Sequence, residues 1–421
     1  MKKIPSVNDI ILTIYLLLML LYVYASATGI SVRLVLAFSL ITLMYFAVKA
    51  RYITIERGEG LWLLASTVMI IWTRRIESDV IYYNVTFLFT LFILIVMQSN
   101  TLNICLDSVI KIFRNMALAT VLLVMLELVF KTKMTGILSI FLPTNALNDE
   151  LLYISAGTGL RGLATSTNAV SLAAFIILTY SLYNFDANRN FNRYLSLVLA
   201  LIALVVCGER SNFIFVPLTL CFVYLTHNNN TKGLKYIKIV FIILLLLGVF
   251  LIIKPQLEQI PALKRTFRTL DMLQKGEEIA GERSILYKRA FEMWQEKPIF
   301  GHGWFEFYYQ NTGILKAGSN SHAHNLLFES LSELGIIGTI LLFMPITHSI
   351  VLNISLLKRY EYIAANHKFK KILEFTLAMQ VFFILDSMLH LTFFSPRVIL
   401  YLLTLFILFN IKRKSENLDE I

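Results

Sequence analysis

The sequence predicts an all-α polytopic membrane protein with about twelve transmembrane helices. Of its 421 residues, 57% are hydrophobic and only 15% are charged, which is less charge than a soluble domain needs to solvate its surface. Apolar runs of ~17–22 residues recur along the chain, and a helix of that length crosses a hydrocarbon core about 30 Å thick. These runs are continuous and lack the alternation of β-barrel strands.

The expected spans alternate with short polar turns. They cover residues 9–27, 30–48, 60–73, 80–98, 115–130, 163–183, 194–208, 211–227, 236–253, 335–356, 373–391 and 397–411. The first run has some features of a signal peptide, but a second span follows at once, so we expect an uncleaved first helix. The chain therefore divides into residues 1–253 with nine helices, a large polar loop at 254–334, and residues 335–421 with three helices and a tail.

Lysine and arginine residues set the expected orientation. Alternate short loops are basic, which the positive-inside rule assigns to the cytoplasm together with both termini. These residues are Lys2, Lys3, Lys49, Arg51, Arg57, Lys111, Arg114, Arg189, Arg193, Lys232, Lys235, Lys238, Lys358, Arg359, Lys368, Lys370, Lys371, Lys412, Arg413 and Lys414. The net charge of +11 is thus explained without a nucleic-acid partner, and the 254–334 loop lies on the outer side.

Some arginines fall on the outer side, where this rule does not explain them: Arg74, Arg75, Arg161, Arg210 and Arg397. Two interpretations fit. Either the side chains reach lipid head groups, or their guanidinium groups bind a phosphate-bearing ligand. Arg210 is the clearest case, because its Gly-Glu-Arg-Ser turn joins two apolar spans with little access to bulk water.

The outer loops contain three expected helices. Residues 137–142 form a short interfacial helix, and residues 261–275 and 282–296 place apolar side chains three and four positions apart. Arg283 begins the last of these, either on a solvated face or in a site.

Two motifs in the polar loop contain histidines: Gly-His-Gly-Trp-Phe at 301–305 and Ser-His-Ala-His-Asn at 321–325. Packing within the loop and acid–base chemistry both remain open for them, whereas His-x-His alone does not define a zinc site. His324 and Asn325 precede a helix, whose free N–H groups favour anions and lower the pKa of a histidine. Gly335 and Gly338 are expected to permit close helix packing.

The chain resembles the O-antigen ligase and polymerase superfamily in three motifs. These are His-Asn followed after nine residues by Gly-x-x-Gly, Pro-Ile-Phe-Gly-His-Gly-Trp at 298–304, and Gly-Glu-Arg-Ser at 281–284 and 208–211. The motifs cover residue 195 to the C-terminus. The resemblance implies a GT-C-like fold and a glycosyltransferase of the bacterial inner membrane that acts at the periplasmic face. It implies transfer of an undecaprenyl-diphosphate-linked glycan to a lipid A–core sugar hydroxyl, with neither metal nor cofactor.

Carried over to this sequence, the resemblance makes His324 the catalytic base, and Arg210 and Arg283 the residues that hold the diphosphate. Arg161, Arg397, His322 and Asn325 are further candidates.

The alternative is a polymerase that joins lipid-linked repeat units. Some polymerases have an Arg-x10-Gly pattern in two loops, which occurs here only once, from Arg265 to Gly276. A transporter would place charges near the middle of the bilayer, whereas the polar residues of this chain gather at the outer face.

Overall fold

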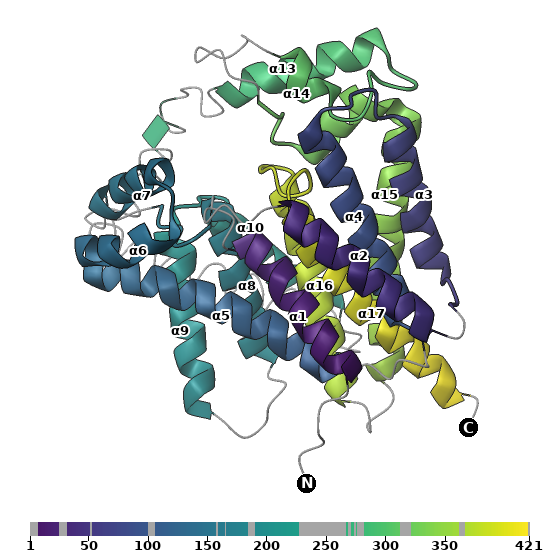
Figure 1. Cartoon of the computed structure of the whole chain (residues 1–421), viewed down its shortest axis with the longest axis horizontal. Coiled ribbons are helices and arrows are strands. Elements are labelled where there is room, and N and C mark those ends of the chain that lie inside the picture. The colour runs from purple at the N-terminus through teal and green to yellow at the C-terminus, as the bar shows by residue number, and fades with distance from the viewer. Residues whose placement is uncertain are drawn as a thin grey trace.

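The computed structural model is built from helices over the residues that it describes (Figure 1). These are residues 7–24, 32–50, 53–99, 106–156, 159–164, 166–183, 190–226, 267, 271–272, 275, 282–311, 321–361 and 367–419. The helices are α1 (Val7–Tyr24), α2 (Val32–Lys49), α3 (Arg57–Ile71), α4 (Ser78–Met97), α5 (Leu106–Phe130), η3 (Lys131–Met134), α6 (Thr135–Phe141), α7 (Thr144–Ala156), α8 (Thr167–Tyr183), α9 (Asn190–Val206), α10 (Asn212–Thr226), α13 (Glu282–Glu296), α14 (Glu306–Gln310), α15 (Leu326–Glu361), α16 (His367–Ser387) and α17 (Val398–Asp419).

Eleven of the twelve expected spans coincide with one of these helices. The expected span at 236–253 lies outside the described residues, as does most of the expected helix at 261–275. Five of the described helices (α1, α2, α4, α5 and most of α15) are long and apolar enough to cross a membrane. The interfacial helix expected at 137–142 corresponds to α6, and the helix expected at 282–296 is α13. The all-helical class is therefore confirmed, with five candidate membrane spans among the described helices.

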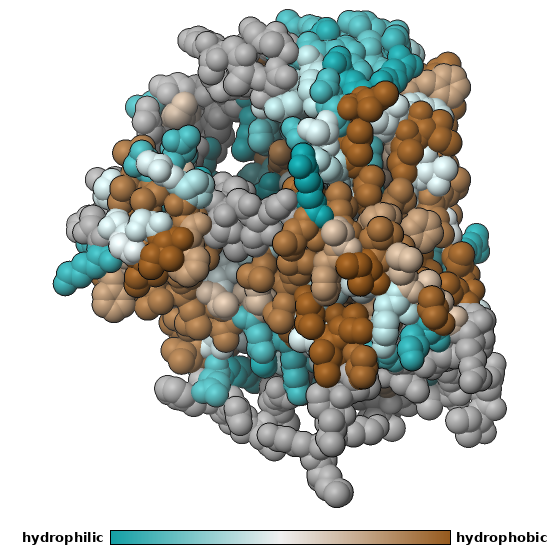
Figure 2. Space-filling model, viewed as in Figure 1, coloured by the Kyte–Doolittle hydropathy of each residue, from teal (hydrophilic) through white to brown (hydrophobic). Residues whose placement is uncertain are grey.

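The helices have two polar ends. At one end, Lys412 and Arg413 of α17 pair with Glu56 and Glu59 beside the start of α3. At the other end, Arg75 pairs with Glu306 of α14. α1 starts and α17 finishes at the first end, whereas α13 and α14 lie at the second (Figure 1). Figure 2 shows a hydrophobic belt between hydrophilic surfaces at these ends.

Helix α8 lies in the core of the bundle. Every side chain from Asn168 to Thr179 is buried, as expected for a helix that is apolar on all faces. It packs against α5, α9 and α16. The ring of Phe175 stacks on Phe382 of α16 with centroids 3.8 Å apart. Consequently, the N-terminal end of α8 and the C-terminal end of α16 are held next to each other, and polar side chains cluster at that point.

Helix α15 bends where it meets the loop that follows α13. Gly335 has φ 64° and ψ −170°, so the helix axis breaks there. A Cβ on Gly335 would lie 2.4 Å from the Ile299 backbone, and a Cβ on Gly301 would lie 2.3 Å from the Glu333 backbone. Gly335 thus permits close approach of a loop, and not of another helix as the sequence suggested. The N–H groups of Ile336 and His302 bond to Pro298 O and Ser332 O across this contact.

Candidate active site

The stretch that contains His324 directly precedes α15 and contacts the loop that joins α16 to α17. Asn325 caps α15, because its Oδ1 accepts hydrogen bonds from the N–H groups of Leu327 and Phe328 at 3.0 Å each. Its Nδ2 donates to Met388 O at 2.9 Å, which ties the cap to the other loop. His324 adopts the left-handed conformation with φ 55°, a strained geometry for a non-glycine residue. The expected helix start at His324-Asn325 is confirmed.

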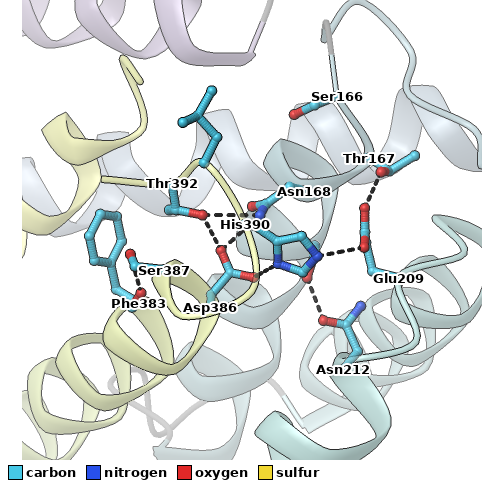
Figure 3. A network of polar contacts seen from close by, with 12 residues as sticks. Ser166, Thr167, Asn168, Glu209, Asn212, Phe383, Asp386, Ser387, His390 and Thr392 are labelled. Carbon is cyan, nitrogen blue, oxygen red and sulfur yellow. Dashed lines mark hydrogen bonds and ion pairs between the residues drawn. The ribbon is translucent and has the colours of Figure 1, made fainter. Parts of the chain in front are cut away.

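An ion-pair network lies at the end of α16 (Figure 3). His390 has a carboxylate on each side of its ring. Asp386 Oδ1 lies 2.8 Å from Nδ1, and Glu209 Oε2 lies 2.9 Å from Nε2. Glu209 comes from the turn between α9 and α10 and also accepts a hydrogen bond from Thr167 of α8. The imidazole of His390 therefore joins three parts of the chain that are distant in sequence.

The second oxygen of Asp386 is held by neutral donors (Figure 3). Asn168 Nδ2 donates to Asp386 Oδ2 at 2.8 Å and lies 3.0 Å from Thr392 Oγ1, while Thr392 Oγ1 donates to the same carboxylate oxygen. Asp386, Asn168 and Thr392 are all buried. This buried network holds the backbone of the loop at 388–397, because its hydrogen bonds connect the loop and α16 with α8.

Arg397 is anchored at the far end of this loop. Its Nε donates to Ser395 Oγ at 2.7 Å, and its two terminal nitrogens donate to Ser166 Oγ at 2.8 Å and Leu391 O at 3.2 Å. None of these acceptors carries a formal charge. The guanidinium group is thus held in place, and within the described part of the chain no carboxylate bonds to it directly, although Asp386 and Glu209 act on it electrostatically.

Positive charge surrounds His324. Burial lowers the pKa of His324 to about 4, and Arg283, His322, His390 and Arg397 lower it in the same direction. Its imidazole is therefore neutral near pH 7. Arg283 also acts on Glu209. Arg283, Arg397 and His390 are thus all within electrostatic reach of the same imidazole.

His390 is cationic in the same environment. Burial opposes its charge, but Asp386 and Glu209 outweigh this effect and raise the pKa of His390 to about 9. Burial also opposes the charge on Glu209, but hydrogen bonds from His390 and Thr167 outweigh it and lower that pKa to about 2. The site consequently holds one neutral and one charged imidazole near pH 7.

The candidates found from the sequence have different surroundings. His324, Arg283 and Arg397 come together, and Asn325 holds the segment. Arg210 lies beside Glu209 in the turn between α9 and α10, partly buried. Arg161 pairs with Glu150 at 2.9 Å, and its guanidinium carbon lies 4.4 Å from the ring centre of Tyr153. Its neighbour Gly159 donates a hydrogen bond to Val206 O at 2.9 Å, so this loop runs close to the turn with Arg210.

His322 and His302 are tied to other groups. His322 Nδ1 bonds to the buried Glu329 of α15, whose other oxygen accepts the Ala323 N–H at 3.0 Å. His302 is buried, and its Nε2 lies 3.0 Å from Met293 O of α13. Trp304 of this motif lies against the C-terminal end of α3, where its N–H donates to Trp72 O at 3.0 Å. The 301–305 motif is therefore part of the scaffold under α13.

Sequence reasoning missed Glu209, Asp386, Thr167 and Asn168. The spacing of Asp386 and His390, one helical turn apart at the end of an apolar span, was a signal for their pairing. No comparable signal linked them to Glu209, because that contact depends on how α8, α10 and α16 pack. Among the described residues, no group of three His, Cys, Asp or Glu side chains is arranged to hold a metal ion.

One family model matches a segment of the chain that contains part of this site. Residues 195–343 match a family model described as O-antigen ligase. The matched segment contains Arg210, Arg283 and His324, and it confirms the resemblance to the O-antigen ligase superfamily. It supports an O-antigen ligase or polymerase type of function, which implies a membrane glycosyltransferase that acts on lipid-linked glycans. No curated protein matches the chain.

Proposed function

We propose that this protein transfers a glycan from undecaprenyl diphosphate to a sugar hydroxyl of lipid A–core, without a metal ion. The observation that carries the proposal is a neutral imidazole, His324, with Arg283, Arg397 and the charged His390 within electrostatic reach. His324 and Arg283 lie in the segment that matches the O-antigen ligase family model. A base and a cluster of cations are the two features that such a reaction requires.

His324 is proposed as the base. One of its ring nitrogens takes the proton of the acceptor hydroxyl as the oxygen attacks the anomeric carbon of the donor. The bond between that carbon and the diphosphate oxygen breaks, and its electron pair leaves with undecaprenyl diphosphate. The left-handed backbone of His324 and the cap formed by Asn325 orient the imidazole before substrate binds. Asn325 is thus a positioning residue.

Cations are proposed to stabilise the leaving diphosphate. Arg283 lies close enough to His324 to influence its pKa, and Arg210 lies in the turn that supplies Glu209. Guanidinium groups bind phosphate oxygens through two parallel hydrogen bonds, which a lysine cannot reproduce. Arg397 contributes a fixed charge, since its own donors already bond to Ser166, Ser395 and Leu391. Arg161 is a weaker candidate, because Glu150 already pairs with it.

Donor binding is expected to activate the base. In the empty site, burial and the neighbouring cations keep the pKa of His324 at about 4, which makes its imidazole a weak base. A bound diphosphate adds negative charge next to those cations and therefore raises the pKa of His324. The imidazole becomes a competent base only when the glycan donor is in place. This arrangement disfavours proton abstraction from an acceptor that has no donor to attack.

The proposed location is the bacterial inner membrane, with both termini in the cytoplasm and the site on the periplasmic side. Support comes from the geometry: α1 starts and α17 finishes at one polar end, and the histidine segment lies beside α13 and α14 at the other (Figure 1). Lys368 pairs with Asp107 and Lys412 with Glu56 among the basic residues of the first end. The finished glycolipid would thus form on the outer side.

The test is a deletion of the gene, followed by complementation and gel analysis of lipopolysaccharide. A ligase mutant is expected to accumulate full-length polymer on undecaprenyl diphosphate with unmodified core. Core with a single repeat unit would instead indicate the polymerase. Arg210→Lys and Arg283→Lys are expected not to complement, whereas Arg289→Lys, whose guanidinium group pairs with Glu292 and Glu296 of its own helix α13, is the matched control. Transfer by the purified protein in the presence of a chelator tests metal independence.

A further inference from the structure

A cavity of about 400 Å³ lies on the other face of the loop at 388–397. It is bounded by residues at the outer ends of α1, α2, α4 and α17, and by α14. Leu391, Phe394 and Pro396 of the loop line it, and His322 lines it from the histidine segment. His324, His390, Arg283 and Arg397 are not among its lining residues. The cavity is therefore distinct from the cationic site, although the same two segments border both.

Tyrosine dominates the wall of this cavity. Five of its sixteen lining residues are tyrosines, whereas the whole chain has 19 in 421 residues. They are Tyr22, Tyr82, Tyr83, Tyr308 and Tyr309. Composition alone would place about one tyrosine there. A tyrosine has an apolar ring and a polar tip, so this wall offers flat apolar surface and hydroxyl groups together.

Several of these rings are held in place by other groups. The Tyr308 ring stacks on His322 with centroids 4.7 Å apart, and His322 is itself fixed by Glu329. The hydroxyl of Tyr83 donates to Phe393 O at 2.6 Å. The guanidinium of Arg75 lies 4.6 Å from the Tyr309 ring centre. A wall that is already ordered loses little conformational freedom when a ligand binds.

The charge of the described lining residues disfavours a phosphate group. Asp79 lines the cavity, and the lining residues that the structure describes include no lysine or arginine. Arg75 and Arg33 contact Tyr309 and Tyr82 from outside this lining. A diphosphate would be repelled there, while the site on the other face of the loop supplies cations. A lipid chain would use the apolar surface, but it would offer no hydrogen bond to the carboxylate of Asp79 or to Thr86 Oγ1, which is buried and has no hydrogen-bonding partner among the described residues. Sugar rings use both kinds of group: their C–H faces pack on aromatic rings, and their hydroxyls bond to carboxylate, imidazole and phenol.

We propose that this cavity binds sugar rings of the acceptor glycan and presents one hydroxyl toward His324. The assignment rests on the proposed transferase function only in naming the glycan as the acceptor. The 321–325 segment then serves both substrates, since His322 faces the sugar cavity and His324, two residues later, lies among the cations. The volume of about 400 Å³ falls within the range of small-molecule sites.

The experiment uses the full-length protein in lipid nanodiscs. The probe is the lipid-free core oligosaccharide of the host lipopolysaccharide, and binding is measured by saturation-transfer NMR. We expect the wild type to bind it and inorganic pyrophosphate not to displace it. Tyr308→Ala is expected to weaken binding about tenfold, whereas Tyr308→Phe, which keeps the ring, stays within about threefold. Tyr194→Ala, exposed on α9, is the matched control.

Asp79→Asn supplies a second variant, because Asp79 is exposed at the start of α4 and its replacement leaves the core unchanged. It is expected to weaken binding severalfold. The proposal is overturned if the oligosaccharide does not bind, if pyrophosphate or a short-chain phospholipid displaces it, or if Tyr308→Ala and Asp79→Asn both bind like the wild type. Oligosaccharide binding by a wild type that transfers no glycan would instead refute the transferase function and retain the sugar site.

Discussion

The two histidine motifs of the polar loop, residues 301–305 and 321–325, look alike in sequence but have different roles in the structure. His302 is buried and bonds to Met293 O, and its neighbour Gly301 packs against the Glu333 backbone. His324 lies among cations on a left-handed backbone next to a helix cap. A histidine surrounded by small residues in the sequence can thus be assigned a structural or a catalytic role only when its partners in the structure are known. One motif builds the support, and the other presents a base.

The largest expected effect separates the two histidines directly. His324→Ala is expected to abolish glycan transfer, by about 10²–10⁴-fold, because general-base catalysis contributes that much. His302→Ala is expected to lower the melting temperature of the purified protein while transfer persists. Transfer is measured on both variants at matched membrane levels. Retained transfer by His324→Ala would refute its assignment as the base.

The glycine contact beneath the first motif is the next target. Gly335→Ala is expected to destabilise the protein by several kcal/mol, since a Cβ there would lie 2.4 Å from the Ile299 backbone and φ is 64°. Gly136→Ala in α6 is the control, because a Cβ at Gly136 meets no atom within 4 Å. Yield and melting temperature in detergent provide the measurement. Equal stability of the two variants would contradict the close backbone approach.

The pH dependence of transfer tests whether the donor activates His324. The rate at low donor concentration gives kcat/KM for the donor, and the pH dependence of this quantity reports the pKa of His324 in the enzyme without bound donor. With the pKa of His324 at about 4, this quantity is expected to stay level on acidification until well below pH 6. The acidic limb of kcat is expected at higher pH, because the bound diphosphate raises the same pKa. Coincident limbs would contradict the coupling.

A smaller effect is expected from the ion-pair network. The pKa of His390 is raised to about 9 in the folded protein, against an ordinary value of 6.5. The stabilisation of the folded protein by protonated His390 is therefore complete below about pH 6.5 and is lost as the pH rises through about 9. The melting temperature should fall across this window in the wild type, and the fall should be smaller in His390→Gln. Parallel profiles for the two proteins would exclude a charged His390.

The sequence by itself determined the all-helical class, the positions of the apolar helices and the helix start at His324-Asn325. Apolar run length and capping chemistry are local properties, so they can be read along the chain. Arg397 was identified in the same way, as a charge next to an apolar span, whereas the roles of His324 and Arg283 came from the resemblance of their motifs to the O-antigen ligase superfamily. The expectation that these three residues lie close together relied on the predicted topology, which places all of them on the outer side of the membrane.

Only the tertiary structure decided which of these residues meet. Glu209 reaches His390 because the buried faces of α8 bring α9, α10 and α16 together at one point. Arg161 is paired by Glu150, and His302 is covered by α13, and neither contact follows from spacing. The cavity lined by tyrosines draws on helices that are hundreds of residues apart. Long-range packing sets such contacts, because a side chain's charge environment depends on which elements its own helix packs against.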